Sequence, residues 1–371
     1  MKETKAFVFS PLSEVLNEYK IPTTIKDEIE YKQVSVRLYG NGVSLREIQK
    51  GTEILTKKQF LVKSKTLIYG TQNLARGAIG ILPDECDGAV ITQNMRVFEI
   101  SDSISPKYLE FILQSTKFVS FVEELEHGAA RAYIYPASFL PIQIPLPPLK
   151  VQNEIVEKIE KQKQIIEGAE KIDVGFSVDQ FIDTNYGEEF IEKLAQVDGS
   201  PVKDLSKLMS ETYVGGENIE SGSGRLLNLQ TVQEAGIIGP SYEFKKGHVV
   251  YSKVRPNLQK CFFADFKGVC SSDIYPLKVN DELVLPKYFA LTLQSKFFAK
   301  KTESFQDGRS GMPKINQDQL AQIKIPLPPL EAQRQIVEKL DRQMQALEGV
   351  RLLKSEAERR IEEILAGVWG E

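Results

Sequence analysis

A proline-rich motif that occurs twice is the feature that most constrains how this chain can fold. It reads IPLPPLKVQNEIVEKIE from Ile144 and IPLPPLEAQRQIVEKLD from Ile325, with 11 of the 17 positions identical. Proline holds its own φ near −65° and biases the preceding residue toward extended backbone. Each motif is therefore predicted to be a stiff strap that a helix can follow. Two copies 181 residues apart indicate a tandem duplication.

The apolar residues that follow each strap recur with a helical period. The mean spacing is about 3.6 residues in the first copy and about 3.5 in the second, as in amphipathic and coiled-coil helices. The two stripes are Val151, Ile155, Ile159, Gln162, Ile166 and Ala169, and Leu340, Met344, Leu347, Val350, Leu353, Ala357, Ile361, Ile364 and Val368. One helix alone cannot bury such a stripe, so the two long helices are predicted to pack against each other as a coiled coil. The alternative is that each helix packs on its own domain.

Weaker repeats precede both straps in the same order. PKYLEFILQSTKF at Pro106 resembles PKYFALTLQSKFF at Pro286, and LIYGTQNLARGAIG at Leu67 resembles VVYSKVRPNLQKCF at Val249. SPLSEVL at Ser10 is aligned with SPVKDLS further along the chain. Short apolar or alternating runs between these segments indicate strands.

The predicted fold class is α+β: two tandem domains of α/β composition, related by a pseudo-twofold internal duplication and joined by the two helices. Glycine and asparagine interrupt any long helix after the first one, which suggests a connector there. The predicted parts are a first domain (1–143), a strap and helix (144–172), a connector (173–198), a second domain (199–324), and a strap and helix (325–371).

Composition narrows the class of protein. The chain has 371 residues, 42% hydrophobic and 26% charged, which is typical of a soluble globular protein with two domains. No apolar run is long enough for a membrane span, and the N-terminus is too weakly apolar for a secretory signal, so a cytoplasmic location is expected. Cys86, Cys261 and Cys270 form no C-x-x-C pair and are predicted to be buried as small apolar side chains.

Charge is unevenly distributed, although the net charge is only −4. Residues 32–76 carry nine Lys or Arg and two acids, and residues 240–315 carry 13 and seven. Residues 152–220 carry seven basic and 16 acidic side chains. Either basic region alone could be an ordinary solvated surface. Two of them at corresponding places in a duplicated chain favour a nucleic-acid partner.

The side chains within these regions suit duplex DNA. Arginine forks match guanine, Asn and Gln amides match adenine, and lysine suits phosphate. The candidate DNA-binding residues are Arg37, Tyr39, Asn41, Arg46, Lys57, Lys58, Asn73, Arg76, Lys253, Arg255, Asn257, Gln259, Lys260 and Arg309.

Several of these motifs carry a family resemblance. IPLPPLxxQ followed by IVEK, present twice, together with SVRLYGNGVSLRE, GAIGILPDECDGAVIT, VVYSKVRPNLQKC and FKGVCSSDIYPL, resembles the specificity subunit of type I restriction-modification systems. The resemblance implies two target recognition domains that read the halves of a bipartite double-stranded DNA site. It also implies that the two long helices hold these domains apart by packing as an antiparallel coiled coil. It also implies methyltransferase subunits, two of them, docked on the helices, and restriction subunits that join through them in phage defence. Candidate partner-binding residues are Gln152, Ile155, Gln333 and Ile336.

Catalytic signatures are missing from the sequence. It contains no G-x-G-x-x-G, no phosphate-binding G-x-x-x-x-G-K-[ST] and no Asn-Pro-Pro-Tyr-like methyltransferase motif, and its two histidines, His127 and His248, lie in no metal-like spacing. The chain is therefore expected to be a non-catalytic DNA-recognition subunit without bound metal or cofactor, with S-adenosylmethionine, ATP and Mg²⁺ on partner subunits. Alternatives are the specificity portion of a fused restriction-methylation enzyme and a repeat scaffold that binds only protein.

Two expectations concern the helices. From Leu149 to Ile172 a helix would be about 36 Å long, near one turn of B-DNA, which suggests that it sets the spacing between half-sites. Deleting residues 346–371 is expected to leave two folded domains that no longer bind methyltransferase.

Overall fold

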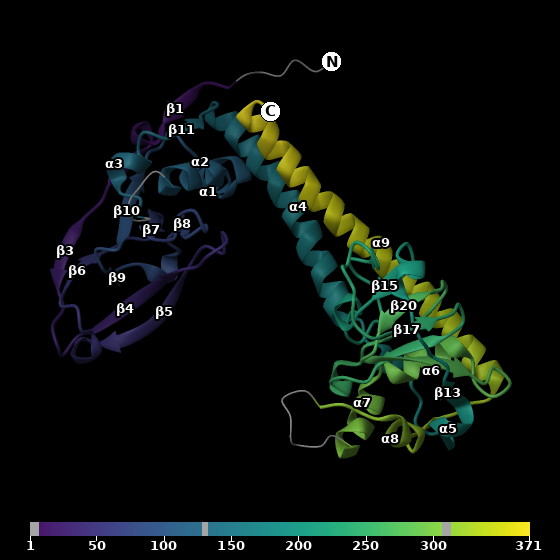
Figure 1. The fold of residues 1–371 in the computed structure, drawn as a ribbon. Coiled ribbons are helices and arrows are strands. Elements are labelled where there is room, and N and C mark those ends of the chain that lie inside the picture. Colours follow the sequence, from purple (N-terminus) through teal and green to yellow (C-terminus); the bar gives the residue numbers. More distant parts are fainter. Residues whose placement is uncertain (1–6, 128–132, 306–312) are drawn as a thin grey trace. The chain divides into compact units, whose positions relative to one another are not determined.

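The computed structural model describes residues 7–127, 133–305 and 313–371 (Figure 1). The chain divides into two compact units. The first unit comprises residues 1–170 and 351–371, and the second comprises residues 171–350. Both mix helices with sheets, so the predicted α+β class is confirmed.

Two sheets form the body of the first unit. One has the strand order β2-β10-β7-β8 and the other β3-β6-β9-β4-β5, and only the β4–β9 pairing in them is parallel. β1 pairs separately with β11, the strand in which the first strap begins. The bounds are β1 Phe9–Pro11, β2 Leu16–Glu18, β3 Ile21–Thr24, β4 Glu30–Val36, β5 Val43–Lys50, β6 Lys58–Leu61, β7 Leu67–Gly70, β8 Ile79–Ile81, β9 Val90–Ile91, β10 Met95–Ile100 and β11 Gln143–Pro145.

Helices cover the smaller sheet of the first unit and complete its core. They are α1 (Pro106–Gln114), α2 (Thr116–His127), α3 (Pro136–Phe139) and α4 (Leu149–Gly175). The last part of α9 (Leu330–Trp369), seen in yellow in Figure 1, belongs to the same core. Leu365, Val368 and Trp369 pack there with α1 and α4 residues.

The second unit repeats the strand orders of the first. Its sheets run β13-β21-β18-β19 and β14-β17-β20-β15-β16, with a parallel β15–β20 pair, and β12 pairs with strap strand β22. Its helices are α5 Ile191–Leu194, α6 Pro286–Leu293, α7 Lys296–Thr302 and α8 Gln317–Ala321. Its strands are β12 Glu188–Phe190, β13 Ala195–Val197, β14 Ser200–Pro201, β15 Thr212–Val214, β16 Gln230–Thr231, β17 Ser241–Phe244, β18 Val249–Ser252, β19 Cys261–Phe263, β20 Gly268–Ser271, β21 Ile274–Val279 and β22 Lys324–Pro326.

The same tyrosine anchors the strap in each unit. Tyr108 of α1 donates a hydrogen bond from its hydroxyl to Pro145 O (2.9 Å), and Tyr288 of α6 donates to Pro326 O (3.2 Å). Both tyrosines are completely buried. The PKY repeat found in the sequence is thus a structural equivalence, and the duplication covers the hydrogen bonds as well as the strand order.

One detail of the predicted duplication needs correction. The second-unit counterpart of β1 is β12, because each pairs with its strap strand, so the SP match at Ser200 is not equivalent to the one at Ser10. Ser200 lies in β14, the counterpart of β3. A two-residue identity was too short to outweigh strand pairing.

The predicted connector is also largely part of the second unit. Val178 and Phe181 are buried in its core, and β12 and β13, both within residues 173–198, pair with its sheets. The first helix also runs three residues beyond the predicted end, to Gly175. Short apolar segments that pair with distant strands carry no local period that would reveal them.

Within the first unit, residues 351–369 of α9 run antiparallel to α4. Glu170 near the end of α4 forms an ion pair with Lys354 (2.8 Å), whereas Ile155 near its start shares the core with Leu365. Leu353, predicted to belong to the buried stripe, is 57% exposed. Coiled-coil packing along the full helices stays a prediction.

Candidate nucleic-acid interface

In the first unit, two loops that carry several candidate residues are joined by backbone hydrogen bonds. The β4–β5 hairpin ends in residues 37–42, and residues 71–78 connect β7 to β8. Tyr39 N donates to Arg76 O (2.6 Å) and Gly40 N donates to Gly77 O (3.2 Å). The sequence-predicted residues of both loops are therefore brought onto one surface.

A side chain of helix α1 also binds one of these two loops. Gln114 donates from Nε2 to Gly40 O (3.1 Å). Gly77 has φ +74°, and a Cβ there would lie 2.7 Å from Gly40 N, so only glycine allows the loops to approach so closely. Tyr39 has a left-handed backbone (φ +59°), which is unfavourable for a residue with a large side chain. The hairpin tip is thus held in one conformation by its neighbours.

Most of the candidate side chains on this surface are exposed to solvent. Tyr39 is 78% exposed, and Arg37, Asn41 and Arg76 are also exposed, whereas Asn73 is half-buried. Exposed cations and amides around an exposed ring can contact phosphates and base edges.

Three other candidates of the first unit lie away from this tip. Lys57 forms an ion pair with Asp27 (2.7 Å) and donates to Gly51 O, at the end of the β4–β5 hairpin opposite its tip. Lys58 begins the neighbouring strand β6. Arg46 lies within β5 and pairs with Glu47 (2.6 Å). The structure does not bring these three cations together with the loop residues.

The second unit places its candidates in the corresponding loop. Residues 253–260 connect β18 to β19, the counterparts of β7 and β8. Arg255 and Gln259 both have left-handed backbones (φ +49° and +54°), and Arg255 and Asn257 are exposed. Gly222 N, in the β15–β16 connection, donates to Gln259 O (3.3 Å), so two loops meet here as well.

The lysines of this loop are partly engaged within the chain. Lys260 donates from Nζ to Gly216 O (2.5 Å). Lys253 lies over the ring of Tyr275, with Nζ 5.0 Å from its centroid. Arg309 lies outside the described residues. The DNA-binding assignments of all these residues stay predictions.

A tyrosine cluster beside the first-unit loops was missed by the sequence analysis. The rings of Tyr133 and Tyr135 stack with centroids 6.2 Å apart and planes 9° apart, and Arg96 lies 5.6 Å from the Tyr135 centroid. Gln72, in the β7–β8 loop, donates to the Tyr133 hydroxyl (2.5 Å). The YIY pattern at residues 133–135 placed two aromatic side chains two residues apart, which was the available signal.

The predicted partner-binding glutamines are used inside the chain. Gln152 is completely buried, accepts from Ser105 N (2.7 Å) and donates to Pro147 O (2.8 Å) and Ser103 O (3.2 Å). Gln333 makes the same set of bonds in the second unit, accepting from Leu285 N (2.7 Å) and donating to Pro328 O (2.8 Å) and Leu283 O (3.2 Å). The IPLPPLxxQ pattern is therefore explained by a glutamine that locks the strap to the helix start.

The two isoleucines of that prediction differ in exposure. Ile155 is 6% exposed and belongs to the first-unit core. Ile336 is half-buried and lines a groove of about 590 Å³ between α9 and residues 180–186. Ile336 is thus a predicted partner-binding residue that lines a groove open to solvent.

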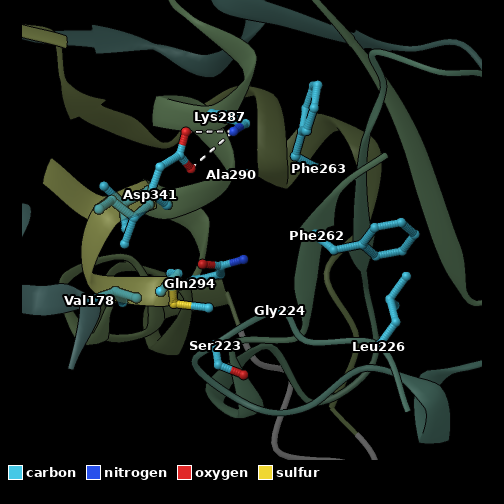
Figure 2. A pocket seen from close by; sticks show the side chains of 13 residues that line it. Val178, Ser223, Gly224, Leu226, Phe262, Phe263, Lys287, Ala290, Gln294 and Asp341 are labelled. Atoms are coloured by element: carbon cyan, nitrogen blue, oxygen red, sulfur yellow. Dashed lines mark hydrogen bonds and ion pairs between the residues drawn. The ribbon is translucent and has the colours of Figure 1, made fainter. Parts of the chain in front are cut away.

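A second hollow, of about 260 Å³, lies between α6 and α9 in the second unit (Figure 2). Phe262, Phe263 and Met344 are among its apolar walls, and Lys287 and Asp341 form an ion pair at it (2.7 Å). The corresponding ion pair in the first unit joins Lys107 to Glu160 (3.9 Å). There, Phe111 and Lys163 occupy the positions of Leu291 and Met344, with Lys163 Nζ 4.5 Å from the Phe111 centroid.

Burial shifts the pKa of titratable groups in the second unit. His248 is 5% exposed, and burial lowers its pKa, while Asp198, 3.3 Å from Nε2, acts in the opposite direction. Burial raises the pKa of the Cys270 thiol to about 12, and all three cysteines are buried and free, as predicted. No group of three His, Cys, Asp or Glu side chains is placed to hold a metal in residues 7–127, 133–305 and 313–371. Over the same residues no helix has the length and apolarity to span a membrane.

Comparisons with known proteins identify a family and several similar proteins. A family model described as the type I restriction modification DNA specificity domain matches residues 5–174 and 219–357. The type I restriction enzyme EcoDI specificity subunit of Escherichia coli is 33% identical over 162 residues, which is 43% of this chain and 35% of that protein. This chain thus matches about a third of that relative's length.

Two solved structures share the fold at low sequence identity. An S subunit of a type I restriction-modification system from M. genitalium is 13% identical with a TM-score of 0.55, and the alignment covers 99% of this chain and 98% of that one. A chain from a structure on complex assembly and conformational transition of the type I R-M system is 16% identical with a TM-score of 0.56, covering 98% of both chains.

Proposed function

Because the chain belongs to the type I restriction modification DNA specificity family, we propose that it is the DNA-recognition subunit of a type I restriction-modification complex. It binds double-stranded DNA at a bipartite target, one half for each unit. The observation that carries this proposal is the repetition of one surface. In the first unit the β4–β5 loop is joined to the β7–β8 loop by backbone hydrogen bonds. In the second unit the equivalent β15–β16 and β18–β19 loops are joined in the same way.

The side chains on the two surfaces support reading of two different half-sites. The first unit presents Arg37, Asn41 and Arg76, and the second presents Arg255 and Asn257. Arginine and asparagine recognise guanine and adenine edges respectively. Because the surrounding strands are equivalent but the side chains differ, the target is expected to be asymmetric. The role of helix length in setting the spacing between half-sites remains a proposal.

Partner subunits complete the proposed assembly. The complex contains two methyltransferase subunits and, through them, restriction subunits, and it acts in the cytoplasm. S-adenosylmethionine, ATP and Mg²⁺ belong to those partners. The groove lined by Ile336 and residues 180–186 is a proposed methyltransferase contact, because it combines open apolar surface with the polar side chains of α9.

The experiment that tests DNA recognition relies on the fact that the chain has two separate compact units. The full chain, assembled with its methyltransferase subunits, selects its target from a random duplex library, and the selected DNA is sequenced. Replacing Arg255 and Asn257 together by alanine should relax one half-site and leave the other unchanged. Each lost base contact removes about 1–3 kcal/mol of discrimination.

Lys246→Ala is the matched control, since this exposed lysine of the second unit lies outside the loop. Its selected target should equal that of the wild-type chain. An unchanged target in the double variant would refute the assignment of these two residues. A wild-type complex that selects no sequence would refute the proposed function itself.

A further inference from the structure

The loop surfaces of the two units are equivalent in backbone but not in chemistry. Gly40 N donates to Gly77 O, and Gly222 N donates to Gln259 O. Gly77 and Gln259 each lie two residues before the equivalent strands β8 and β19. Tyr39, which precedes Gly40, therefore has Ser221 as its counterpart.

The tyrosine cluster can be matched in the same way. Ile134 N donates to Thr71 O (2.9 Å), and Ile315 N donates to Lys253 O (3.0 Å). Thr71 and Lys253 are the first residues after β7 and β18 respectively. The counterparts of Tyr133 and Tyr135 are therefore Lys314 and Asn316.

The second unit has ionic and amide groups where the first unit has rings. Lys314 forms an ion pair with Asp273 (2.9 Å), and Lys253 lies over Tyr275. Asn316 caps α8 by accepting from Gln319 N (2.8 Å). The three aromatic positions of the first unit are thus replaced by Ser, Lys and Asn.

The rings of the first unit are exposed on a backbone that is held in place. Tyr39 and Tyr135 are 78% and 50% exposed, and Tyr133 is half-buried. The backbone at Tyr39 is fixed through Arg76 O, and Gln72 of the same loop holds Tyr133 by its hydroxyl. Contact with a planar or apolar ligand therefore costs little ordering of the chain.

We propose that Tyr39, Tyr133 and Tyr135 form an aromatic base-contacting surface of the first unit, whereas the equivalent surface of the second unit acts through charged and amide groups. The rings pack against thymine methyl groups at the edges of base pairs, as apolar side chains do in the major groove. This inference rests on the proposed DNA binding and specifies its chemistry. Loss of the rings should therefore leave the salt dependence of binding unchanged, because ring contacts release no counterions whereas lysine contacts with phosphate do.

The test measures the affinity of the full chain, assembled with methyltransferase subunits, for the duplex that the wild-type complex selects. The variant Tyr39→Ser with Tyr135→Asn introduces the residues of the second unit. We expect it to weaken binding about 10-fold or more, since the loss of correct contacts at one base pair of a duplex site costs about 1–3 kcal/mol. The slope of log affinity against log salt should stay unchanged, and only one half-site should lose its base preference.

Three further variants separate the ring contact from other effects. Tyr39→Phe with Tyr135→Phe keeps both rings and should keep most of the affinity. Leu55→Ser changes a 96% exposed apolar side chain of the first unit outside the two joined loops and should have no effect. Lys253→Ala should lower the salt slope by about 1 while retaining the base preference of the first unit.

The outcomes distinguish this inference from the proposed function. If the wild-type complex binds no duplex selectively, the proposed function fails. If it binds selectively and the Ser/Asn variant keeps its affinity and both half-site preferences, DNA recognition stands and the aromatic surface is refuted. A fall in the salt slope of the Ser/Asn variant, or a Phe variant as weak as the Ser/Asn variant, would also refute it.

Discussion

The buried Gln152, which joins the first strap to the start of α4, should contribute several kcal/mol to the free energy of unfolding. Gln152→Leu keeps a similar volume but removes one acceptor and two donor interactions, those with Ser105 N, Pro147 O and Ser103 O. A buried polar group that loses its partner costs about 1–3 kcal/mol, and the leucine regains some of this by apolar contact. We therefore expect a loss of about 3 kcal/mol in the free energy of unfolding.

The chain provides its own reporter for this measurement. Trp369 is the single tryptophan, is 7% exposed, and donates from Nε1 to Ser115 Oγ (3.0 Å) within the first unit. Its fluorescence in a urea titration therefore follows the unit that contains Gln152. With a denaturant slope of about 2 kcal/mol per molar, the midpoint should fall by about 1.5 M.

Asn153→Ala, one residue further along the same helix, is the control. Asn153 is exposed, so its midpoint should shift by less than about 0.3 M. If Gln152→Leu shifts the midpoint no more than this control does, the structural role of the glutamine is refuted. A variant of normal stability that no longer binds methyltransferase would instead restore the partner-binding role predicted from the sequence.

Two other predictions concern the second unit. Leu291→Phe introduces the residue found at Phe111 in the first unit and should fill part of the 260 Å³ hollow, raising stability by about 0.5–2 kcal/mol; a lower thermal midpoint would contradict this. Burial lowers the pKa of His248 below its unfolded value of 6.5, so the folded state favours the neutral imidazole. Its contribution to stability is therefore complete above pH 6.5 and is lost as the pH falls below that value. Urea midpoints at pH 7.5 and 5.5 should differ less in His248→Gln than in the wild-type chain, and an equal difference would exclude this histidine as the cause.

The duplication and the helix starts could be predicted from the sequence because both are local. Proline restricts backbone angles wherever it occurs, so IPLPPL specified an extended strap before α4 and α9 without reference to the rest of the chain. Apolar residues at a helical period likewise identified the two long helices, although not the exposure of Leu353. The candidate loops were found because basic, amide and glycine residues cluster within short segments.

Tertiary structure alone assigned the ends of the chain to their units. Residues 351–371 belong to the first unit, where Leu365, Val368 and Trp369 complete the core. A deletion of residues 346–371 would remove these side chains, so we now expect it to destabilise the first unit, contrary to the expectation from the sequence that two folded domains would remain. An apolar stripe on a helix indicates that the helix packs against another segment, but it does not identify that segment.

The sequence by itself determined that this chain is a tandem repeat with two straps, two long helices and basic loops, because backbone restriction and periodicity act over a few residues. Only the tertiary structure decided that Gln152 and Gln333 are buried, that the loops of each unit are joined, and that Tyr39 and Tyr135 lie on exposed surface. Burial and hydrogen bonding depend on which distant strands pair, such as the parallel β4–β9 and β15–β20 pairs. Such pairings are decided by the free energy of the whole packed unit, which no short window of sequence contains.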